Sequence, residues 1–294
     1  KRAVGLPGET IQVVDGDIHA NGRLCRKTLS EQRAIRISVY DDRFRPAGSR
    51  DRWTKGPGWD DREDRFLFCP REPDSEMSWL VYKHLDVSRP GPVRDRYGYN
   101  PRAPRSETRV VRDLMVSLDV ESPSASSQLR IELDTGEHRV AWVRDTHLHK
   151  QWLLVDDQQV ASSRLEQGRE PLGLEFSTFD RTLRAAESAR PVFEPVLLEP
   201  ADSSRPASTP LQIGASGSSL AISHVRLDRD IFYRGGPGQN GTRTAWQLGA
   251  DEYFVLGDNS PVSLDSRSWS LPAVPRHLLV GRPLLVHLPS RPWQ

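Results

Sequence analysis

The chain has 294 residues, a length that normally divides into two domains with separate hydrophobic cores. Its 41 Lys and Arg residues nearly balance its 40 Asp and Glu residues, and a net charge of +1 provides no field that would attract nucleic acid. The 36% hydrophobic content, with 21 Gly and 23 Pro, is typical of a β-rich protein with many loops rather than a helical bundle. The sequence holds no run of about 18 apolar residues, so we expect no segment of it to span a membrane.

The chain starts at Lys1, without a methionine and in the middle of a predicted strand. We therefore expect it to be part of a longer protein from which targeting or anchoring segments have been removed. Its two cysteines, Cys25 and Cys69, are too few for a disulfide framework or a zinc site. They either form a single bridge in an oxidising compartment or stay as two free thiols.

Turn signals divide the first 24 residues into short hairpin strands. Pro7-Gly8 has the form of a tight turn, because proline sets one backbone angle and glycine accepts a positive φ at the next position. Asp15-Gly16 is typical of a two-residue hairpin loop. The start of the chain is therefore predicted to be β-structure.

The next stretches have a different pattern. Residues 30–40 predict a short helix capped by Ser30. From 41 to 108 Asp, Arg, Pro and Gly dominate, which is typical of irregular chain, with a short helix near 76–85. At the other end, two apolar runs around Gly281 predict a closing pair of strands.

Residues 109–233 contain regular short strands separated by turns. Apolar side chains alternate with polar ones over 114–120 and 129–133, and DTGE at 134–137 marks a turn after the second run. This spacing predicts an antiparallel β-sandwich. The segments 174–187, 210–217 and 220–234 resemble the jelly-roll fold of laminin-G and concanavalin-type lectin modules.

Two motifs near the ends of the chain carry residues suited to chemistry. Lys1-Arg2 comes before a Leu-Pro-Gly turn, and Gly257-Asp258-Asn259 comes before a serine- and charge-rich segment that ends at 267. A lysine amine can take a proton from a serine hydroxyl only if the amine is neutral, and a second hydroxyl can aim it. Residues 263, 265 and 267 are two apart, so in extended chain they lie on the same side.

Taken together, these motifs resemble the bacterial type I signal peptidase family of serine–lysine endopeptidases. By this resemblance Lys1 is the general base and Ser263 is the hydroxyl that orients its amine. The resemblance implies supporting roles for seven further residues, of which the Asp265–Arg267 charge pair would brace the loop: Arg2, Gly257, Asp258, Asn259, Asp265, Ser266 and Arg267.

The nucleophile of the family is a serine in a Ser-x-x-Pro setting that precedes the lysine and follows a transmembrane helix. The resemblance therefore implies that the nucleophile lies outside this chain, and Ser260 is not expected to replace it. The 294 residues alone are accordingly expected to be inactive as a peptidase.

The predicted fold class is mainly β, with a signal-peptidase-like catalytic domain split by an inserted antiparallel jelly roll. Insertion at an exposed loop leaves the host strands undisturbed. The predicted segments are the first part of the catalytic domain at 1–45, an irregular linker at 46–108, the lectin-like sandwich at 109–234 and the second catalytic part at 235–294.

The first functional hypothesis is a signal-peptidase-like serine endopeptidase that acts on exported preproteins. The resemblance implies a place at the bacterial cytoplasmic membrane, with one N-terminal anchor missing from this chain and the catalytic domain on the extracytoplasmic side. The alternative is a glycan- or protein-binding lectin-like module on an inactive peptidase homologue. Neither hypothesis requires a cofactor or a metal ion.

Weaker signals have simpler explanations. His147 and His149 lie two apart, as two metal ligands on a strand would, but no third ligand is evident. The acidic pairs at 156–157 and 228–230 are compatible with calcium, although exposed loop charge explains them better. Three tryptophans flank the catalytic segments and suit either core packing or a membrane interface: Trp246, Trp269 and Trp293.

Overall fold

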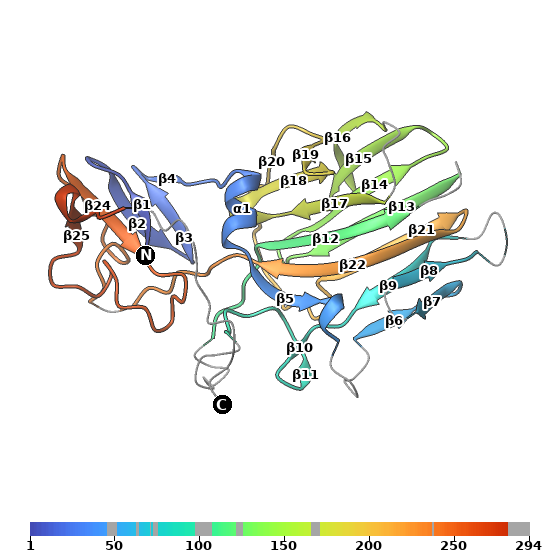
Figure 1. The fold of residues 1–294 in the computed structure, drawn as a ribbon, viewed down its shortest axis with the longest axis horizontal. Helices are drawn as coiled ribbons and strands as arrows, with labels where there is room; N and C mark the ends of the chain where they lie inside the picture. Colours follow the sequence, from blue (N-terminus) through green and yellow to red (C-terminus); the bar gives the residue numbers. More distant parts are fainter. Residues whose placement is uncertain are drawn as a thin grey trace. The chain divides into compact units, whose positions relative to one another are not determined.

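The computed structural model describes residues 1–45, 52–62, 65–70, 72, 76–97, 108–121, 126–165, 171–236 and 238–281. Within these ranges the protein is mainly β, with antiparallel sheets, which confirms the predicted fold class (Figure 1). None of the helices in these ranges is long and apolar enough to cross a membrane. The chain divides into two compact units, a smaller one of Lys1–Cys25 with Tyr233–Gln294 and a larger one of Arg26–Phe232.

The smaller unit contains two sheets with the orders β1-β24-β25 and β23-β2-β3-β4. Its elements are β1 (Arg2–Gly5), β2 (Thr10–Val14), β3 (Asp17–Ala20), β4 (Arg23–Leu24), β23 (Trp246–Gln247), β24 (Glu252–Leu256), β25 (Ala273–Pro275) and the 3₁₀ helix η4 (Arg276–Leu278). Strand β1 pairs antiparallel with β24, with a bulge between Ala3 and Gly5. A Cβ atom on Gly5 would lie 2.5 Å from Ile11 Cγ1 and 2.9 Å from Phe254 Cβ, so glycine lets the bulge approach the core.

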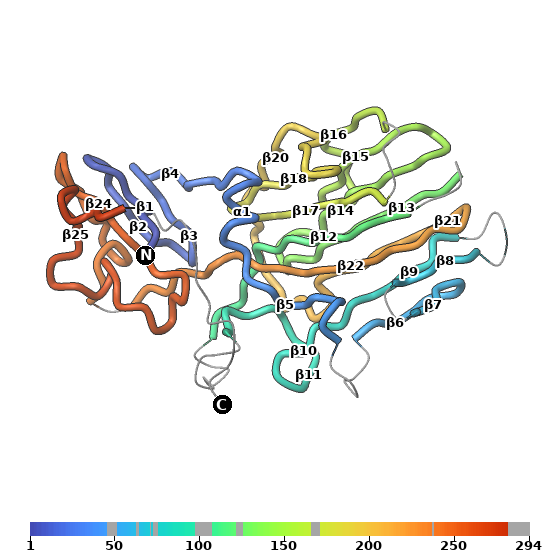
Figure 2. Tube along the Cα trace, in the orientation of Figure 1, coloured from blue at the N-terminus to red at the C-terminus, as the bar shows by residue number. Residues whose placement is uncertain are grey.

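The larger unit is an antiparallel β-sandwich. Its first sheet has the order β19-β18-β17-β12-β22-β8-β7, with β20 and β5 paired at its sides, and its second has the order β16-β15-β14-β13-β21-β9-β6. Strands distant in sequence pair at its centre, as β12 does with β22 (Figure 2). The bounds of the elements before 121 are α1 (Leu29–Ile35), β5 (Ile37–Asp41), η1 (Asp42–Phe44), β6 (Trp53–Lys55), β7 (Trp59–Arg62), β8 (Arg65–Phe68), β9 (Ser78–Tyr82), β10 (Leu85–Asp86), β11 (Arg89–Pro90) and β12 (Leu114–Glu121).

The remaining elements of this unit complete both sheets. They are β13 (Ser127–Asp134), β14 (Arg139–Asp145), β15 (Lys150–Val155), β16 (Gln158–Arg164), β17 (Leu172–Ser177), η3 (Phe179–Arg181), β18 (Thr182–Glu187), β19 (Arg190–Pro191), β20 (Val196–Leu197), β21 (Leu211–Gly217) and β22 (Leu220–Arg229). The core lies between the sheets, where Trp142 of β14 and Phe176 of β17 are both fully buried with ring centroids 6.2 Å apart. The strands predicted over 114–120 and 129–133 are confirmed.

Helix α1 packs on the outer face of the first sheet. Thr28, rather than the predicted Ser30, caps it, and Glu31 completes a capping box. Leu29 joins Met115, Phe179 and Ala186 in a small buried cluster. The helix ends at Ile35, and the predicted helical pattern beyond it is instead strand β5, in which Ile37 and Val39 favour extended chain.

The prediction of irregular chain over 46–108 was wrong for β6 to β11, because β6 to β9 extend the two sheets and β10 and β11 form a hairpin of their own. Each strand is only two to five residues long, too short for alternation to stand out among the charges. The segment predicted as a helix near 76–85 contains strand β9, in which Leu80 and Tyr82 face the core. Of the predicted closing strands, residues 276–278 form η4 and residues 282–294 lie outside the described residues.

A buried charge cluster lies at the start and the end of the larger unit. The Lys27 ammonium donates hydrogen bonds to Asp180 and to Asp230 at 2.8 Å, and both carboxylates are almost completely buried. Burial alone would lower the pKa of Lys27, but the charges of Asp230 and Asp180 outweigh burial and raise it. The first residues of this unit are thereby fastened to its last strand.

We expect Lys27→Met to destabilise the larger unit by about 3–5 kcal/mol, because two buried carboxylates lose their cation. Urea unfolding, followed by hydrogen exchange of the β22 amides, measures this loss. Arg62→Ala is the control, since the Arg62–Asp60 pair is exposed and should contribute less than about 1 kcal/mol. Equal stability losses in the two variants would contradict the structural role of Lys27.

Candidate active site

The pairing of β1 with β24 brings the two terminal motifs together. Arg2 lies opposite Leu256 in the ladder, so the residue before Arg2 meets the residue after Leu256. Lys1 therefore reaches the loop that follows β24, and its Nζ donates a hydrogen bond to Ser263 Oγ at 2.6 Å. The two residues are 262 positions apart in sequence, and both motif predictions fall on this contact.

Gly257 lies directly against the Lys1–Ser263 pair. A Cβ atom at this position would be 2.0 Å from Ser263 Oγ and 2.9 Å from Lys1 Nζ. Any side chain larger than hydrogen would therefore displace the hydroxyl, the amine or both. The glycine of the second motif is required by this close approach.

Asp265 is the buried carboxylate that supports the loop carrying Ser263. Its Oδ2 accepts the backbone N–H of Gly257 at 3.0 Å and a guanidinium N–H of Arg267 at 2.7 Å, while Oδ1 accepts Arg267 Nε at 2.9 Å. Burial alone would raise the pKa of Asp265, but hydrogen bonds from Arg267, Gly257 and Ser263 and the charge of Arg267 together hold the pKa below its usual value. The Lys1 amine donates to Ser263 Oγ, so the hydroxyl oxygen is the acceptor in this contact.

Arg267 extends the same network into the unit. One amino group donates to the carbonyl oxygen of Arg234 at 2.7 Å and to Ser260 Oγ at 2.8 Å, and the guanidinium lies 5.9 Å from the ring centroid of Tyr233. Asp265 and Arg267 are both almost fully buried. This bidentate charge pair is therefore the internal support of the loop that carries Ser263.

The other motif residues support the surroundings. Ser266 Oγ accepts the backbone N–H of Val255 at 2.8 Å and so ties the loop to β24. Arg2 and Asp258 form a bidentate pair with N–O distances of 2.7 and 3.1 Å at the surface. The carbonyl oxygen of Asn259 accepts the N–H of Val262 and tightens the turn.

Asn240 is a site residue that the motifs did not indicate. Its side-chain amide donates to the carbonyl oxygens of Ser266 at 3.1 Å and Trp269 at 2.9 Å, and its backbone N–H donates to the carbonyl oxygen of Arg267. Asn240 lies in a glycine-rich segment whose sequence predicts only a turn. Its place behind the loop that carries Ser263 depends on tertiary contacts, which local sequence does not encode.

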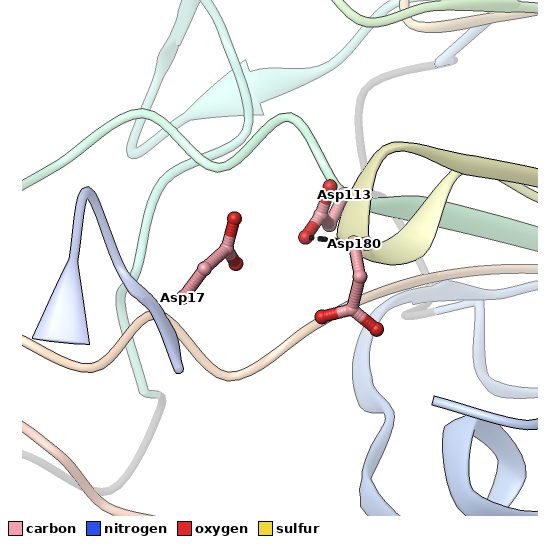
Figure 3. A group of neighbouring side chains, drawn as sticks. All are labelled: Asp17, Asp113 and Asp180. Carbon is pink, nitrogen blue, oxygen red and sulfur yellow. Dashed lines mark hydrogen bonds between the residues drawn. The ribbon is translucent and has the colours of Figure 1, made fainter. Parts of the chain in front are cut away.

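The acidic groups considered for metals have cationic partners. Asp228 and Asp230 are buried and paired with arginine or lysine, so the expectation of exposed loop charge was wrong for them. In Figure 3, the Asp180 backbone N–H donates to Asp113 Oδ2 at 3.2 Å; the third aspartate drawn, Asp17, belongs to the smaller unit.

The other residues considered as candidates are two histidines, two cysteines and three tryptophans. Asp156 accepts a hydrogen bond from His138 at 2.7 Å, whereas His147 and His149 lie in the turn between β14 and β15. Cys25 and Cys69 are not joined in a disulfide. Trp246 and Trp269 are partly buried, and Trp293 lies outside the described residues.

A model of the family described as signal peptidase, peptidase S26, matches residues 225–288. The matched region contains every residue of the second motif and the supporting Asn240, but not Lys1. This match supports a signal-peptidase-like relationship for that part of the chain. A search of curated proteins found no match.

Several solved structures share a loose likeness with the chain. The carbohydrate-binding module CBM66 from Bacillus subtilis aligns at 10% identity and a TM-score of 0.37, over 60% of this chain and 95% of the module. The exoplasmic/lumenal domain of VIP36, in a form bound to Ca²⁺ and Man3GlcNAc, aligns at 10% identity and a TM-score of 0.37, over 65% and 88%. A mutant Trypanosoma rangeli sialidase aligns at 8% identity and 0.38, over 60% of this chain and 27% of the enzyme. Likenesses of this size carry no inference about function.

We expect the stability of the smaller unit to fall on acidification in a way that depends on Asp265. Because its folded pKa lies below the unfolded value of about 3.9, the stabilising contribution is complete above that value and is lost as pH falls through the folded pKa. Hydrogen exchange of the Gly257 amide, followed from about pH 5 down to about pH 2, measures this loss.

Asp265→Asn should remove the acid dependence and destabilise the loop by about 3–5 kcal/mol at neutral pH, because Arg267 keeps a buried, unpaired charge. Asp258→Asn is the control, since the exposed Arg2–Asp258 pair should contribute no more than about 1 kcal/mol. An Asp265→Asn protein with the wild-type pH profile would reject this account.

Proposed function

We propose that the smaller unit carries the lysine side of a signal-peptidase-type serine endopeptidase site. The observation that supports this most strongly is the 2.6 Å contact between Lys1 Nζ and Ser263 Oγ, which joins two motifs from the ends of the chain. The family match over 225–288 is independent support. The proposed substrates are exported preproteins with small residues before the cleaved bond.

Lys1 is the proposed general base. A serine from outside the 294 residues attacks the carbonyl carbon of the substrate and gives its proton to Lys1 Nζ, and Lys1 then protonates the leaving amine. The resulting acyl-enzyme is hydrolysed by a water whose proton Lys1 accepts. Ser263 positions the amine throughout, and Asp265 supports the loop that carries Ser263 through Gly257 and Arg267.

The serines of the loop are poorly suited to be the nucleophile. Ser260 Oγ accepts the N–H of Arg234 at 2.7 Å as well as the guanidinium of Arg267, and Ser266 Oγ accepts the N–H of Val255. Both side chains are buried. Ser263 Oγ accepts a hydrogen bond from Lys1 Nζ at 2.6 Å, and the family resemblance assigns this hydroxyl the orienting role.

A neutral amine requires exclusion of water, yet Lys1 is exposed in this chain. The proposal therefore requires that bound substrate, a membrane surface or protein outside the described residues cover Lys1 during the reaction. A site on the extracytoplasmic side of the bacterial membrane, where preproteins emerge, meets this requirement.

The natural full-length protein tests the proposal through cleavage of a preprotein with an Ala-x-Ala site. Lys1→Ala should lower kcat/KM by about 100-fold or more, the usual contribution of a general base. Ser263→Ala should lower kcat by up to about 100-fold with little change in KM, because it misorients the amine without touching substrate. Lys83→Ala, which removes an exposed lysine of the other unit, is the control. Undiminished turnover by Lys1→Ala would reject the assignment.

The 294-residue chain by itself should form no acyl-enzyme, because an oriented base alone supplies no attacking oxygen. Mass spectrometry after incubation with the preprotein should detect neither cleaved product nor a covalent adduct. A covalent adduct on Ser263 would show that the proposed positioning residue is the nucleophile.

A second candidate function belongs to the larger unit, which we propose to be a binding module for a glycan or a protein. The supporting observation is the outer face of the sheet β16-β15-β14-β13-β21-β9-β6, where Trp79 and Trp152 point away from the core. Aromatic side chains on a polar sheet face are typical of ligand sites rather than of solvated strands. In this second candidate function, the peptidase-like unit is an inactive homologue that serves as the platform of the binding module.

A further inference from the structure

Strand register places one row of residues across the outer face of the seven-stranded sheet. Pairing runs from Trp152 of β15 to Val143 of β14 and on to Arg130 of β13. It continues to Gly214 of β21 and Trp79 of β9. The row thus has a tryptophan at each end and an arginine in the middle.

The opposite face of the same strands defines this row as the outer one. Leu129, Ile131, Trp142, Leu153 and Leu80 alternate with the row residues and belong to the core between the two sheets. Trp79 and Trp152 are both partly exposed and lie outside that core. In the other sheet, α1 covers part of the outer face, whereas among the described elements no helix packs on this one.

The spacing of the two tryptophans suits an extended ligand. They are separated by four interstrand steps, β15-β14-β13-β21-β9, which corresponds to about 19 Å at about 4.8 Å per step. A linear chain of several pyranose rings has this length. Between the tryptophans, Val143 has a short side chain and Gly214 has none, and Arg130 lies at the centre of the row.

Side chains beside the row orient the aromatic rings. The guanidinium of Arg130 lies 5.8 Å from the ring centroid of Trp79, and Lys150 Nζ lies 5.9 Å from that of Trp152. The space above Gly214 is occupied by Met77, whose Sδ would be 2.5 Å from a Cβ at that position. Met77 and Arg130 thus limit the movement of Trp79, and a preorganised ring loses little entropy on binding.

The polar groups on this face are charged but mutually paired. Arg130 donates to Glu132 at 2.9 Å and to Asp157 at 3.0 Å, and Arg139 pairs with Glu132 at 3.1 Å. On the same face, Gln128 donates to Asp145 at 2.9 Å. Such pairs present donors and acceptors side by side with little net charge, which matches the vicinal hydroxyl groups of a neutral sugar better than an anionic ligand.

We propose that a neutral linear oligosaccharide binds across the strands of this face, stacked on Trp152 at one end and Trp79 at the other, with its hydroxyl groups on Arg130 and on Asp157, the exposed carboxylate paired with it. This inference rests on the proposed binding function of the larger unit and is independent of the peptidase site. It identifies the ligand class, the direction of the chain across the sheet and the two stacking residues.

Calorimetry with the 294-residue chain tests the proposal, using cellohexaose, chitohexaose and mannohexaose and the trisaccharide of each series. At least one hexasaccharide should bind, and it should bind more tightly than its trisaccharide, because only the longer chain reaches both tryptophans. Trp79→Ala and Trp152→Ala should each weaken the hexasaccharide by about tenfold or more. Each variant should also remove the advantage of the hexasaccharide over the trisaccharide, an effect that general loss of stability would not produce.

Phe44→Ala is the matched control. Phe44 is an exposed ring with Arg43 5.6 Å from its centroid, and it lies next to β5 of the other sheet, so its loss should leave binding unchanged. Thermal melting of every variant identifies any that fails to fold, and Trp79→Phe and Trp152→Phe, which keep a ring, should retain most of the affinity. A hexasaccharide that binds both alanine variants as well as wild type would overturn the site but not the binding function. Lack of binding by the wild-type chain to every hexasaccharide would overturn the proposal of a glycan-binding unit.

Discussion

The antiparallel pairing of β1 with β24 is the interaction on which the candidate active site depends. It places Lys1 beside Gly257 although nearly two hundred and fifty residues separate the strands in sequence, and no local contact could do so. Closure of so long a loop costs entropy that grows only slowly with length, so the inserted unit adds little to that cost if it folds by itself. In the smaller unit, Cys25 and Tyr233 both donate to the β2–β3 hairpin, at the carbonyl oxygens of Ile18 and Gly16, which keeps the two ends of the insertion close together.

Buried charge pairs constrain the path of the chain in both units. Asp265 and Arg267 support the loop of Ser263 from inside, and Lys27 joins the first residues of the larger unit to Asp230 at its end. Such pairs gain little net stability over apolar packing, but the loss of one partner is costly. They therefore act as strong constraints on loop geometry at the two places where the chain path matters most.

The two units offer surfaces of different chemistry. The smaller one presents an amine bonded to a hydroxyl, on a loop that a buried carboxylate supports, an arrangement suited to proton transfer. The larger one presents separated aromatic rings with paired charges between them, an arrangement suited to holding an extended neutral ligand. A protein with both would combine hydrolysis of emerging polypeptide with attachment to a hydroxyl-rich polymer, and each activity can be tested without the other.

The sequence by itself determined the mainly β class, the strands with clear alternation after 114, and the residue types of the two terminal motifs, because these depend on local period and composition. It could not reveal the short strands β6 to β9, whose few apolar residues are hidden among charges and become core only by pairing with β21 and β22. Only the tertiary structure decided that Gly257 must lack a side chain and that Asn240 lies behind the loop that carries Ser263. It also decided that Trp79, Arg130 and Trp152 share one row. The physical reason is the same in each case: strand register and loop packing join residues far apart in sequence, and neither leaves a mark on the local pattern.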